Sequence, residues 1–305
     1  MDIIDCFFFY DKRLKNTYTN SKIVELNKDT KFIIFSDAHR GDGTWADDFA
    51  PNYHLLLYSL KHYYEDGFTL IELGDCNEMW KNTSFKEIFD AHSYIYELIK
   101  QFYDDKRYYL VYGNHDIDLK YQRNIVKHLY YYYKKSLEDY LPFLKGIRVY
   151  GGLVLRNREE NYELFLTHGH QVDIISDCFW WFSKFFIRYI IKPLQLLGVK
   201  DPTSPAKNFG KRKKIEKRLI EWTKRNNKIL ICGHTHRPVL PRENEVPYLN
   251  SGSCVFPHAI TGLEIVGNLI MLVKWWLKPD KDGLLKISRE VLEGPRDLRL
   301  YNKNN

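Results

Sequence analysis

The sequence predicts an α/β protein with mixed β-sheets, and three observations support this prediction. Five short apolar runs end in polar residues, in the segments KFIIFSDAH, TLIELGDCNE, YYLVYGNHD, ELFLTHGH and KILICGHTH. Such runs are typical of buried strands. Helical patterns separate the first three runs, which favours parallel strands with crossover helices. Three further strands between residues 147 and 167 leave no room for helices, so part of the sheet system should be antiparallel or mixed.

The remaining elements follow in chain order. After Asp37 comes a polar, Gly-rich loop, and the tail from Asn302 to Asn305 reads as disordered. The patterns predict helices at 54–64, 85–102 and 121–140, and strands at 108–112, 147–150, 152–156, 162–167 and within 246–277.

The chain reads as one domain spanning residues 1–305, because the candidate site residues run from Asp37 to His236 and no cut leaves a complete site on either side. A hydrophobic fraction of 44% supports a sizeable core. A helical insertion is expected at 173–222, where it could act as a lid. No internal repeat and no low-complexity linker interrupts the chain.

Five scattered cysteines without C-x-x-C spacing argue against a disulfide framework or a thiolate metal site. The start, MDIIDCFFFYDKR, is acidic where a signal peptide needs positive charge, and its apolar stretch is too short. We therefore expect a cytoplasmic protein.

Residues of types that can bind metal ions follow the five apolar runs. They are Asp37, His39, Asp75, Asn114, His168, His234 and His236. Two carboxylates, one carboxamide and four imidazoles are too many for one closed zinc site. Two divalent ions about 3.5–4 Å apart, bridged by a carboxylate and a hydroxide, would use all seven and leave positions for substrate. Asp and His also serve as turn and cap residues at strand ends, which is the simpler explanation for any single segment.

Three of the runs reach their polar residues through Gly74, Gly113 and Gly233. Glycine permits a sharp turn at these points.

The segments resemble the calcineurin-like metallophosphoesterase family, whose pattern is D-x-H, G-D-x-x-E/D, G-N-H-D/E, an isolated His and G-H-x-H. This chain fills every slot in order, over about residues 31 to 260. The resemblance implies a four-layer α/β/β/α sandwich with two mixed sheets. It also implies that Asp37, His39 and His236 hold one metal, that Asn114, His168 and His234 hold the other, and that Asp75 bridges them. Mn is the first expectation for the ions, with Fe, Co and Zn as alternatives.

The same resemblance implies that His115 lies beside the leaving oxygen as a proton donor or charge stabiliser, with Asp116 as its orienting partner. Arg237, His170 and Arg40 are candidates for substrate contact. For His170, an ordinary hydrogen-bonded loop position is an equally good interpretation.

Within the family, the chain looks closest to the branch of UDP-2,3-diacylglucosamine pyrophosphohydrolases. The shared features are the G-D-x-x-E-x-W string at 74–80, an apolar helical insertion after the H-G motif, and the G-H-T-H-R-P string ending at Pro238. His115 departs from that branch, whose best-known members have Arg there. No lipid-contact residue can be carried over.

The insertion contains a helical segment with a basic stripe. Lys184, Arg188 and Lys192 recur every four residues, and the other faces carry Phe179, Trp180, Phe182, Phe185, Phe186 and Ile190. The segment at 177–192 is too charged to span a membrane. It could lie at a membrane surface, cover an amphiphilic substrate, or pack on the protein's own body.

A cationic run follows at Lys211–Lys214, and the net charge is +7. These charges favour an anionic partner. The partner could be a small phosphorylated substrate, with or without a linked lipid, or the acidic inner face of a membrane. Nucleic acid is disfavoured, since no recognised binding module is present.

Three functions remain open from the sequence. A binuclear phosphoesterase or pyrophosphohydrolase comes first; a nuclease or nucleotide phosphodiesterase of the same superfamily and a non-catalytic scaffold are the alternatives. The intact ligand set argues against the scaffold.

Overall fold

The larger of the two main β-sheets has the strand order β14-β13-β12-β2-β3-β4-β7 in the computed structural model, which describes residues 3–134, 137–173, 180–198 and 209–302. Four of its strands are parallel, and three antiparallel strands extend one side. The strands are β2 (Lys31–Phe35), β3 (Thr69–Leu73), β4 (Tyr108–Val111), β7 (Val149–Tyr150), β12 (Ala259–Val266), β13 (Leu269–Pro279) and β14 (Leu285–Asp297).

The smaller sheet has the order β1-β8-β9-β10-β11. Its pairs are parallel except for β8 with β9, which are joined by a tight connection and run antiparallel. The strands are β1 (Lys22–Glu25), β8 (Gly152–Asn157), β9 (Tyr162–Thr167), β10 (Ile229–Cys232) and β11 (Tyr248–Asn250). Both sheets are therefore mixed, as the sequence predicts.

The two sheets pack face to face with helices outside. Along β2, Phe32 and Ile34 enter a buried cluster shared with side chains of the smaller sheet, whereas Ile33 and Phe35 enter a cluster shared with helices. This alternation is the period-2 pattern of a strand buried on both faces. Each large apolar side chain buried in this way contributes about 1.5–3 kcal/mol.

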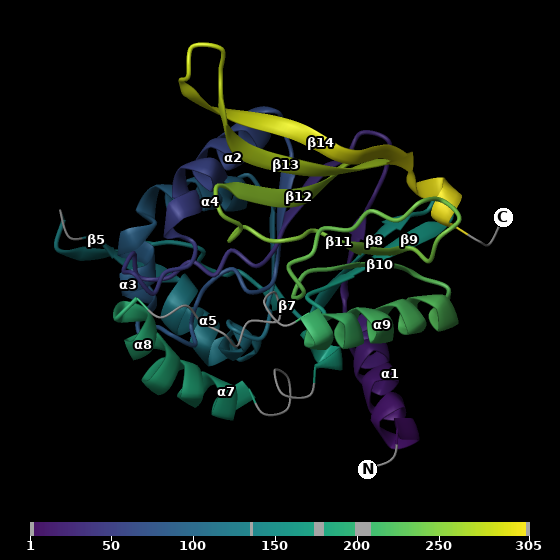
Figure 1. The fold of residues 1–305 in the computed structure, drawn as a ribbon, viewed down its shortest axis with the longest axis horizontal. Helices are drawn as coiled ribbons and strands as arrows, with labels where there is room; N and C mark the ends of the chain where they lie inside the picture. Colours follow the sequence, from purple (N-terminus) through teal and green to yellow (C-terminus); the bar gives the residue numbers. More distant parts are fainter. Residues whose placement is uncertain (1–2, 135–136, 174–179, 199–208, 303–305) are drawn as a thin grey trace.

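The helical layers lie on opposite sides of the sandwich (Figure 1). Helices α2 (Tyr53–Glu65), α3 (Phe85–Ala91) and α4 (Ser93–Asp104) cover the larger sheet. Helices α1 (Ile3–Thr19) and α9 (Phe209–Asn226) cover the smaller one. The four-layer α/β/β/α arrangement is confirmed.

The remaining short elements are η1 (Ala50–Asn52), η2 (Ile117–Lys120), α5 (Gln122–Leu129), η3 (His170–Val172) and η5 (Leu298–Tyr301). Among the described residues, no helix is both long and apolar enough to cross a membrane.

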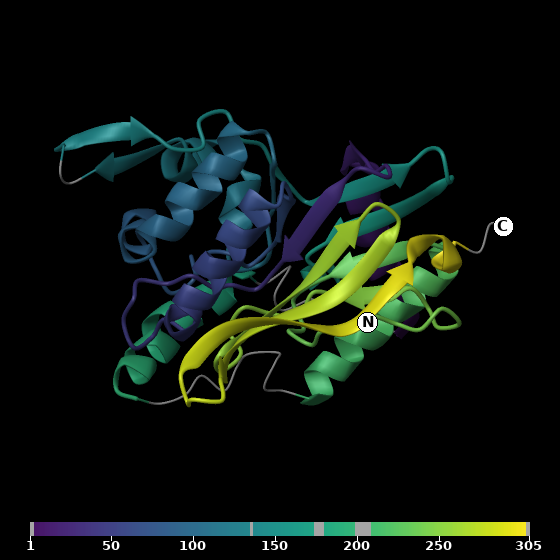
Figure 2. The ribbon, with the colours of Figure 1, turned by 90° about the horizontal axis from the view of Figure 1, so that it is seen from above.

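Several predicted elements differ from the structure. The predicted helix at 121–140 is wrong beyond Leu129: the Tyr-rich stretch forms β5 (Tyr131–Lys134), which pairs with β6 (Asp139–Pro142) in a projecting hairpin (Figure 2). Aromatic side chains favour strands, and this preference outweighs the helical pattern. The helical pattern at 85–102 is broken at His92 into α3 and α4. Strand β14 and helix α1 were not predicted.

The insertion between β9 and β10 is helical where it is described. Helix α7 (Trp180–Phe186), the π-helical turn η4 (Ile187–Ile191) and α8 (Lys192–Leu196) form one arm, and α9 follows. Residues 174–179 and 199–208, including Phe179 of the predicted helix, lie outside the described part of the chain, as do tail residues 303–305.

Candidate metal centre

The carboxyl ends of strands from both sheets deliver all seven candidate ligands to one region. Asp37, Asp75 and Asn114 follow β2, β3 and β4 of the larger sheet, and His168 and His234 follow β9 and β10 of the smaller sheet. The ends of parallel strands meet at one sheet edge, so a site at that edge collects residues from distant parts of the chain. All seven side chains are buried.

Asp37, His39 and His236 form the first group. Asp37 Oδ1 lies 3.1 Å from His236 Nε2 and 3.8 Å from His39 Nε2. The two imidazoles approach each other, with 3.4 Å between their Nε2 atoms. The other oxygen of Asp37 accepts hydrogen bonds from Ser36 Oγ and the His234 amide, which fixes the carboxylate.

Asp75, His168 and His234 form the second group, whose ligand atoms lie within 4.8 Å of one another. Asp75 Oδ2 is 3.2 Å from His168 Nε2, and it is also 3.8 Å from His39 Nε2 of the first group. His168 Nδ1 bonds to the Leu73 carbonyl, which leaves Nε2 facing Asp75. Asp75 thus lies between the two groups.

Four buried atoms of these residues make no hydrogen bond to any described residue. They are Asp37 Oδ1, Asn114 Oδ1, His168 Nε2 and His234 Nε2. The close approaches of Asp37 Oδ1 and His168 Nε2 to their neighbours lack hydrogen-bond alignment. Buried polar atoms without partners are rare and costly in folded proteins. Oxygen and imidazole nitrogen atoms of this kind are ligands for divalent metals, so the residues fit such ions.

Five of the seven ligands hold left-handed backbone conformations. The φ angles are 52° for Asp37, 48° for His39, 52° for Asp75, 64° for His234 and 56° for His236. Such conformations are uncommon outside glycine and concentrate at functional sites. Their repetition at five converging residues is more than turn formation alone would require, and it supports the hypothesis of a functional site.

The three glycines act mainly through close packing. Gly74 has a φ of 88°, which matches the expected sharp turn, but Gly113 and Gly233 do not have positive φ. A Cβ atom on Gly113 would lie 2.1 Å from Asp75 Oδ1, and one on Gly233 would lie 2.5 Å from Asp37 Oδ2. The absent side chains therefore make room for the two carboxylates.

We expect Gly113→Ala to lower metal content, because the added methyl group must displace the Asp75 carboxylate. Gly67→Ala is the control: it also adds a Cβ atom, at a φ of 76°, but that atom has nothing within 4 Å. That control should lose stability only. Elemental analysis and denaturant unfolding distinguish the two, and normal metal content in Gly113→Ala would contradict this account of Asp75.

His115 is held by Glu78, not by Asp116. His115 Nδ1 lies 2.8 and 2.9 Å from the two Glu78 oxygens, and its ring stacks on Trp80 with centroids 4.1 Å apart. Asp116 instead accepts hydrogen bonds from the amides of Gly113, Cys76 and Asn77. The prediction that Asp116 orients His115 is therefore wrong, because its carboxylate is occupied in closing the loop.

The charges around His115 favour its protonated form. Burial opposes protonation, but Glu78 and Asp75 outweigh it and raise the pKa of His115 to about 9. At Asp37, burial is outweighed by His236 and His168, which lower its pKa to about 2. Burial and the charge of Asp75 raise the pKa of Asp116 to about 7. The site thus places a cationic imidazole beside ionised metal-binding carboxylates.

A family model described as the calcineurin-like phosphoesterase superfamily domain matches residues 31–266. The chain belongs to this superfamily. Its members are usually hydrolases and typically bind divalent metals, and the clusters around Asp37 and Asp75 fit that chemistry. No curated protein matches the sequence.

Solved structures give more distant similarities. Vacuolar protein sorting 29 from Cryptosporidium parvum aligns with a TM-score of 0.39 at 16% identity, over 87% of this chain and 98% of its own. Vps29 from Chaetomium thermophilum gives 0.38 at 11% identity, over 86% and 96%. The 5'-nucleotidase from Candida albicans gives 0.28 at 12% identity, over 89% of this chain and 52% of that one. These scores are too low to carry an inference about function.

Arg40 is not placed to contact substrate. Its guanidinium is fully buried, pairs with both oxygens of Glu72 at 2.6 and 3.1 Å, and lies over the Tyr96 ring. Arg40 was a candidate for substrate contact, but its side chain is buried in the core and balances the buried Glu72.

His170 and Arg237 remain candidates. His170 is buried, with its ring centroid 5.5 Å from that of His168, and burial together with His168 and His234 lowers its pKa well below the ordinary value. A neutral imidazole there is compatible with either earlier interpretation. Arg237 is about half exposed and pairs with Glu216 of α9 at 2.9 Å.

Sequence reasoning missed Asp173. Its Oδ2 lies 3.4 Å from His234 Nε2 and 2.8 Å from Lys211 Nζ. Lys211 is therefore linked to the metal region by Asp173. This contact distinguishes Lys211 from the other cations of the run at 211–214. No spacing motif marks Asp173, because it follows a short 3-10 turn rather than a strand.

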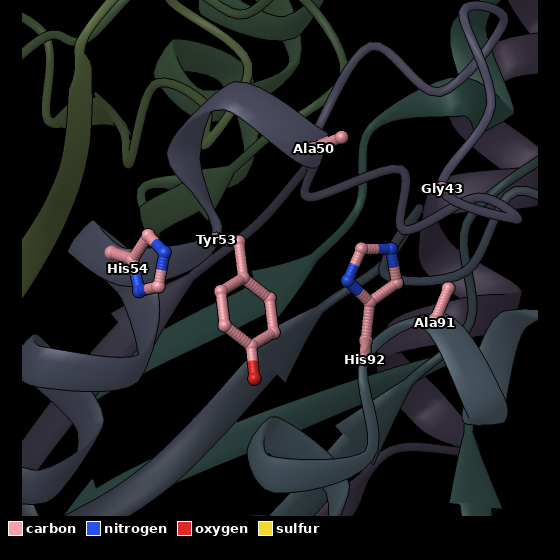
Figure 3. Close-up of a pocket in the computed structure, with 6 residues that line it drawn as sticks. All are labelled: Gly43, Ala50, Tyr53, His54, Ala91 and His92. Carbon is pink, nitrogen blue, oxygen red and sulfur yellow. The ribbon is translucent and has the colours of Figure 1, made fainter.

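A separate hollow of about 200 Å³ lies by Tyr53, His54 and His92, with Gly43, Ala50 and Ala91 completing its lining (Figure 3). It contains none of the seven ligands. Its buried member, His92, pairs with Asp47 at 2.8 Å and thereby ties the loop after Arg40 to the start of α4. We assign this hollow no part in the chemistry.

Proposed function

We propose that the protein is a binuclear metal-dependent phosphoesterase or pyrophosphohydrolase. The observation that carries this proposal is the position of Asp75, which lies within 3.8 Å of a histidine from each ligand group. A shared carboxylate between two ligand sets is what a two-metal site requires. Mn is the preferred ion, with Fe, Co and Zn as alternatives.

When bound, divalent ions at such a site lower the pKa of water and neutralise charge on phosphoryl oxygens. The protein's own residues do the rest. His115 donates a proton to the leaving oxygen from the side opposite its bond to Glu78, and Glu78 keeps the imidazole charged and oriented. No covalent enzyme intermediate is needed, since phosphoryl transfer depends mainly on positioning and electrostatic stabilisation.

For the substrate, we propose a lipid-linked or nucleotide-sugar diphosphate, as in the UDP-2,3-diacylglucosamine pyrophosphohydrolase-like branch. Support comes from the orientation of the inserted arm. Its cations face the protein: Lys184 pairs with Asp118, and Lys192 pairs with Asp42 at 2.7 Å. Its aromatic side chains Trp181, Phe182, Phe185 and Tyr189 are 57–61% exposed.

This orientation gives the two faces of the arm different contacts. The sequence left open whether the segment lies at a membrane, covers a substrate or packs on the protein, and in the structure its basic stripe anchors the arm on acidic and carbonyl groups. Trp180 and Phe186 pack inward against Trp80 and Ile187. The exposed aromatic face is suited to an acyl chain or to the interface of an anionic membrane, so we propose peripheral membrane contact from the cytoplasmic side.

If the arm recognises an apolar chain, phosphate compounds with acyl or prenyl chains should show higher kcat/KM than their soluble headgroups. Each buried methylene contributes about 0.8 kcal/mol to such a preference. Replacing both Trp181 and Phe185 with Ser should remove the preference without slowing hydrolysis of a small diester. Tyr94→Ser, which removes an exposed aromatic side chain of α4, should leave it intact.

A screen of the metal-loaded protein against UDP-sugars, lipid-linked diphosphates, nucleoside polyphosphates and artificial diesters tests the function as a whole. Equal rates for short and long chains, with no binding to anionic liposomes, would favour a soluble nucleotide or sugar phosphate. Hydrolysis of DNA or RNA with steep salt dependence would indicate the nuclease alternative. Failure on every class would favour a non-catalytic scaffold.

A further inference from the structure

Arg188 of the inserted arm binds the turn that follows the metal-binding loop of β3. Its Nε donates to the Trp80 carbonyl at 3.0 Å, and its Nη2 donates to the carbonyls of Met79 and Asn82 at 2.8 and 3.0 Å. One guanidinium therefore closes a turn of four residues from outside. The planar, rigid fork of arginine is suited to this, whereas a lysine ammonium is not.

Two side chains hold His115: Trp80 belongs to this turn, and Glu78 directly precedes it and is hydrogen-bonded to it. Glu78 Oε1 accepts hydrogen bonds from the Trp80 and Lys81 amides at 3.2 Å, while the same carboxylate bonds to His115. The Trp80 ring stacks on the His115 ring, with an interplanar angle of 21°. A shift of this turn would thus move the partner and the stacking surface of His115 together.

The helical backbone of the arm changes to a π-helical turn at Arg188. Residues 187–191 form a π-helical turn in which the Lys192 amide donates to the Ile187 carbonyl, five residues earlier. Pro193 follows and cannot donate a helical hydrogen bond. Ile187 and Ile191 on either side of Arg188 are buried against Trp80. Such π-helical turns are often found at functional sites.

We infer that Arg188 is a positioning residue for His115, acting through the Met79–Asn82 turn and the Trp80 ring. The inference rests on the proposed function, in which His115 serves the leaving group. It gives the insertion a second role. Besides presenting an exposed aromatic face, the arm holds in place the residues that position His115. Reacting groups displaced by about 1 Å lose up to roughly a hundredfold in rate.

The test uses Arg188→Met, which keeps much of the side chain's length but removes its donors. In the full-length metal-loaded protein, kcat for a diester with an alkyl leaving group should fall about ten- to a hundredfold. The rate for a nitrophenyl diester should change far less, because that leaving group needs little protonation. Metal content should stay unchanged. Arg188→Lys, if Arg188→Met does not fold, should show a smaller loss in the same direction.

A second readout is independent of activity. The Trp80 ring, stacked at 4.1 Å, should shift the ring protons of His115 upfield in the NMR spectrum of the metal-free protein. The spectrum of His115→Gln assigns these signals. Arg188→Met should reduce the upfield shift.

Lys184→Met is the matched control, since Lys184 anchors the same arm but pairs with Asp118 outside the turn. It should leave the His115 signals and the leaving-group dependence unchanged. Equal losses on both diesters, or identical His115 signals in Arg188→Met and wild type, would overturn the inference. If the wild-type protein hydrolyses neither diester, the proposed function fails, and the NMR comparison alone decides the role of Arg188.

Discussion

Replacing His115 with alanine is expected to leave metal content unchanged and to reduce turnover by roughly 10²–10⁴-fold, the usual contribution of a positioned proton donor. The imidazole lies beside the ligand clusters, 4.5 Å from the His39 ring between centroids, and its Nδ1 is bound to Glu78. Glu78 and Asp75 raise its pKa, which favours the protonated form.

The dependence on the leaving group separates two roles for His115. The loss should shrink for substrates such as nitrophenyl diesters, whose leaving group is already a weak base. Glu78→Gln should give a milder version of the same pattern, because the hydrogen bond remains while the charge is lost. Equal losses for good and poor leaving groups would contradict proton donation and favour simple charge stabilisation.

The second large effect is expected for Asp75, the proposed bridge between the ions. Asp75→Ala should lower occupancy at both positions together, because Asp75 lies between the two ligand groups. Asp75→Asn isolates the charge, since the amide oxygen can still accept the hydrogen bond from the His115 amide. Both variants should lose activity on every substrate, whatever the leaving group.

Asp42→Ala is the control for Asp75. It removes a carboxylate from the loop after Arg40 that binds Lys192 and Thr44 and touches no proposed ligand. Its metal content should match that of the wild type. Loss of only one ion in Asp75→Ala would show that Asp75 serves one metal and does not bridge.

The ligand set could be predicted from sequence because each member follows a short buried strand, and strand ends converge at one edge of a sheet. His168 and His234 are 66 residues apart, yet both follow strands that pair directly. The left-handed conformations at Asp37 and Asp75 could not be predicted, since propensities disfavour them. They are imposed by the packing of the loops, which Gly113 and Gly233 make possible.

The residues that surround the ligands were harder to predict. Asp116 is adjacent to His115 in sequence, but neighbours along a loop point in different directions, and the partner of His115 is Glu78 from another strand end. The arm shows a similar limit. Periodicity places Lys184, Arg188 and Lys192 on one face, but it does not say whether that face meets solvent or the carbonyl-rich turn of another loop.

The stretch around Tyr131 shows a third limit. A run of aromatic residues is compatible with a helix or a strand, and pairing with residues 139–142 selects the strand. Strand β14 escaped prediction because most of its side chains are exposed and many are charged, so that only its pairing with β13 defines it.

We expect one chain to hold two divalent ions through Asp37, His39, Asp75, Asn114, His168, His234 and His236. The most direct measurement is elemental analysis of the purified protein after anaerobic reconstitution with Mn, Fe, Co or Zn, each followed by removal of loosely bound ions. Two ions per chain are expected. One tightly held ion, or none, would contradict it.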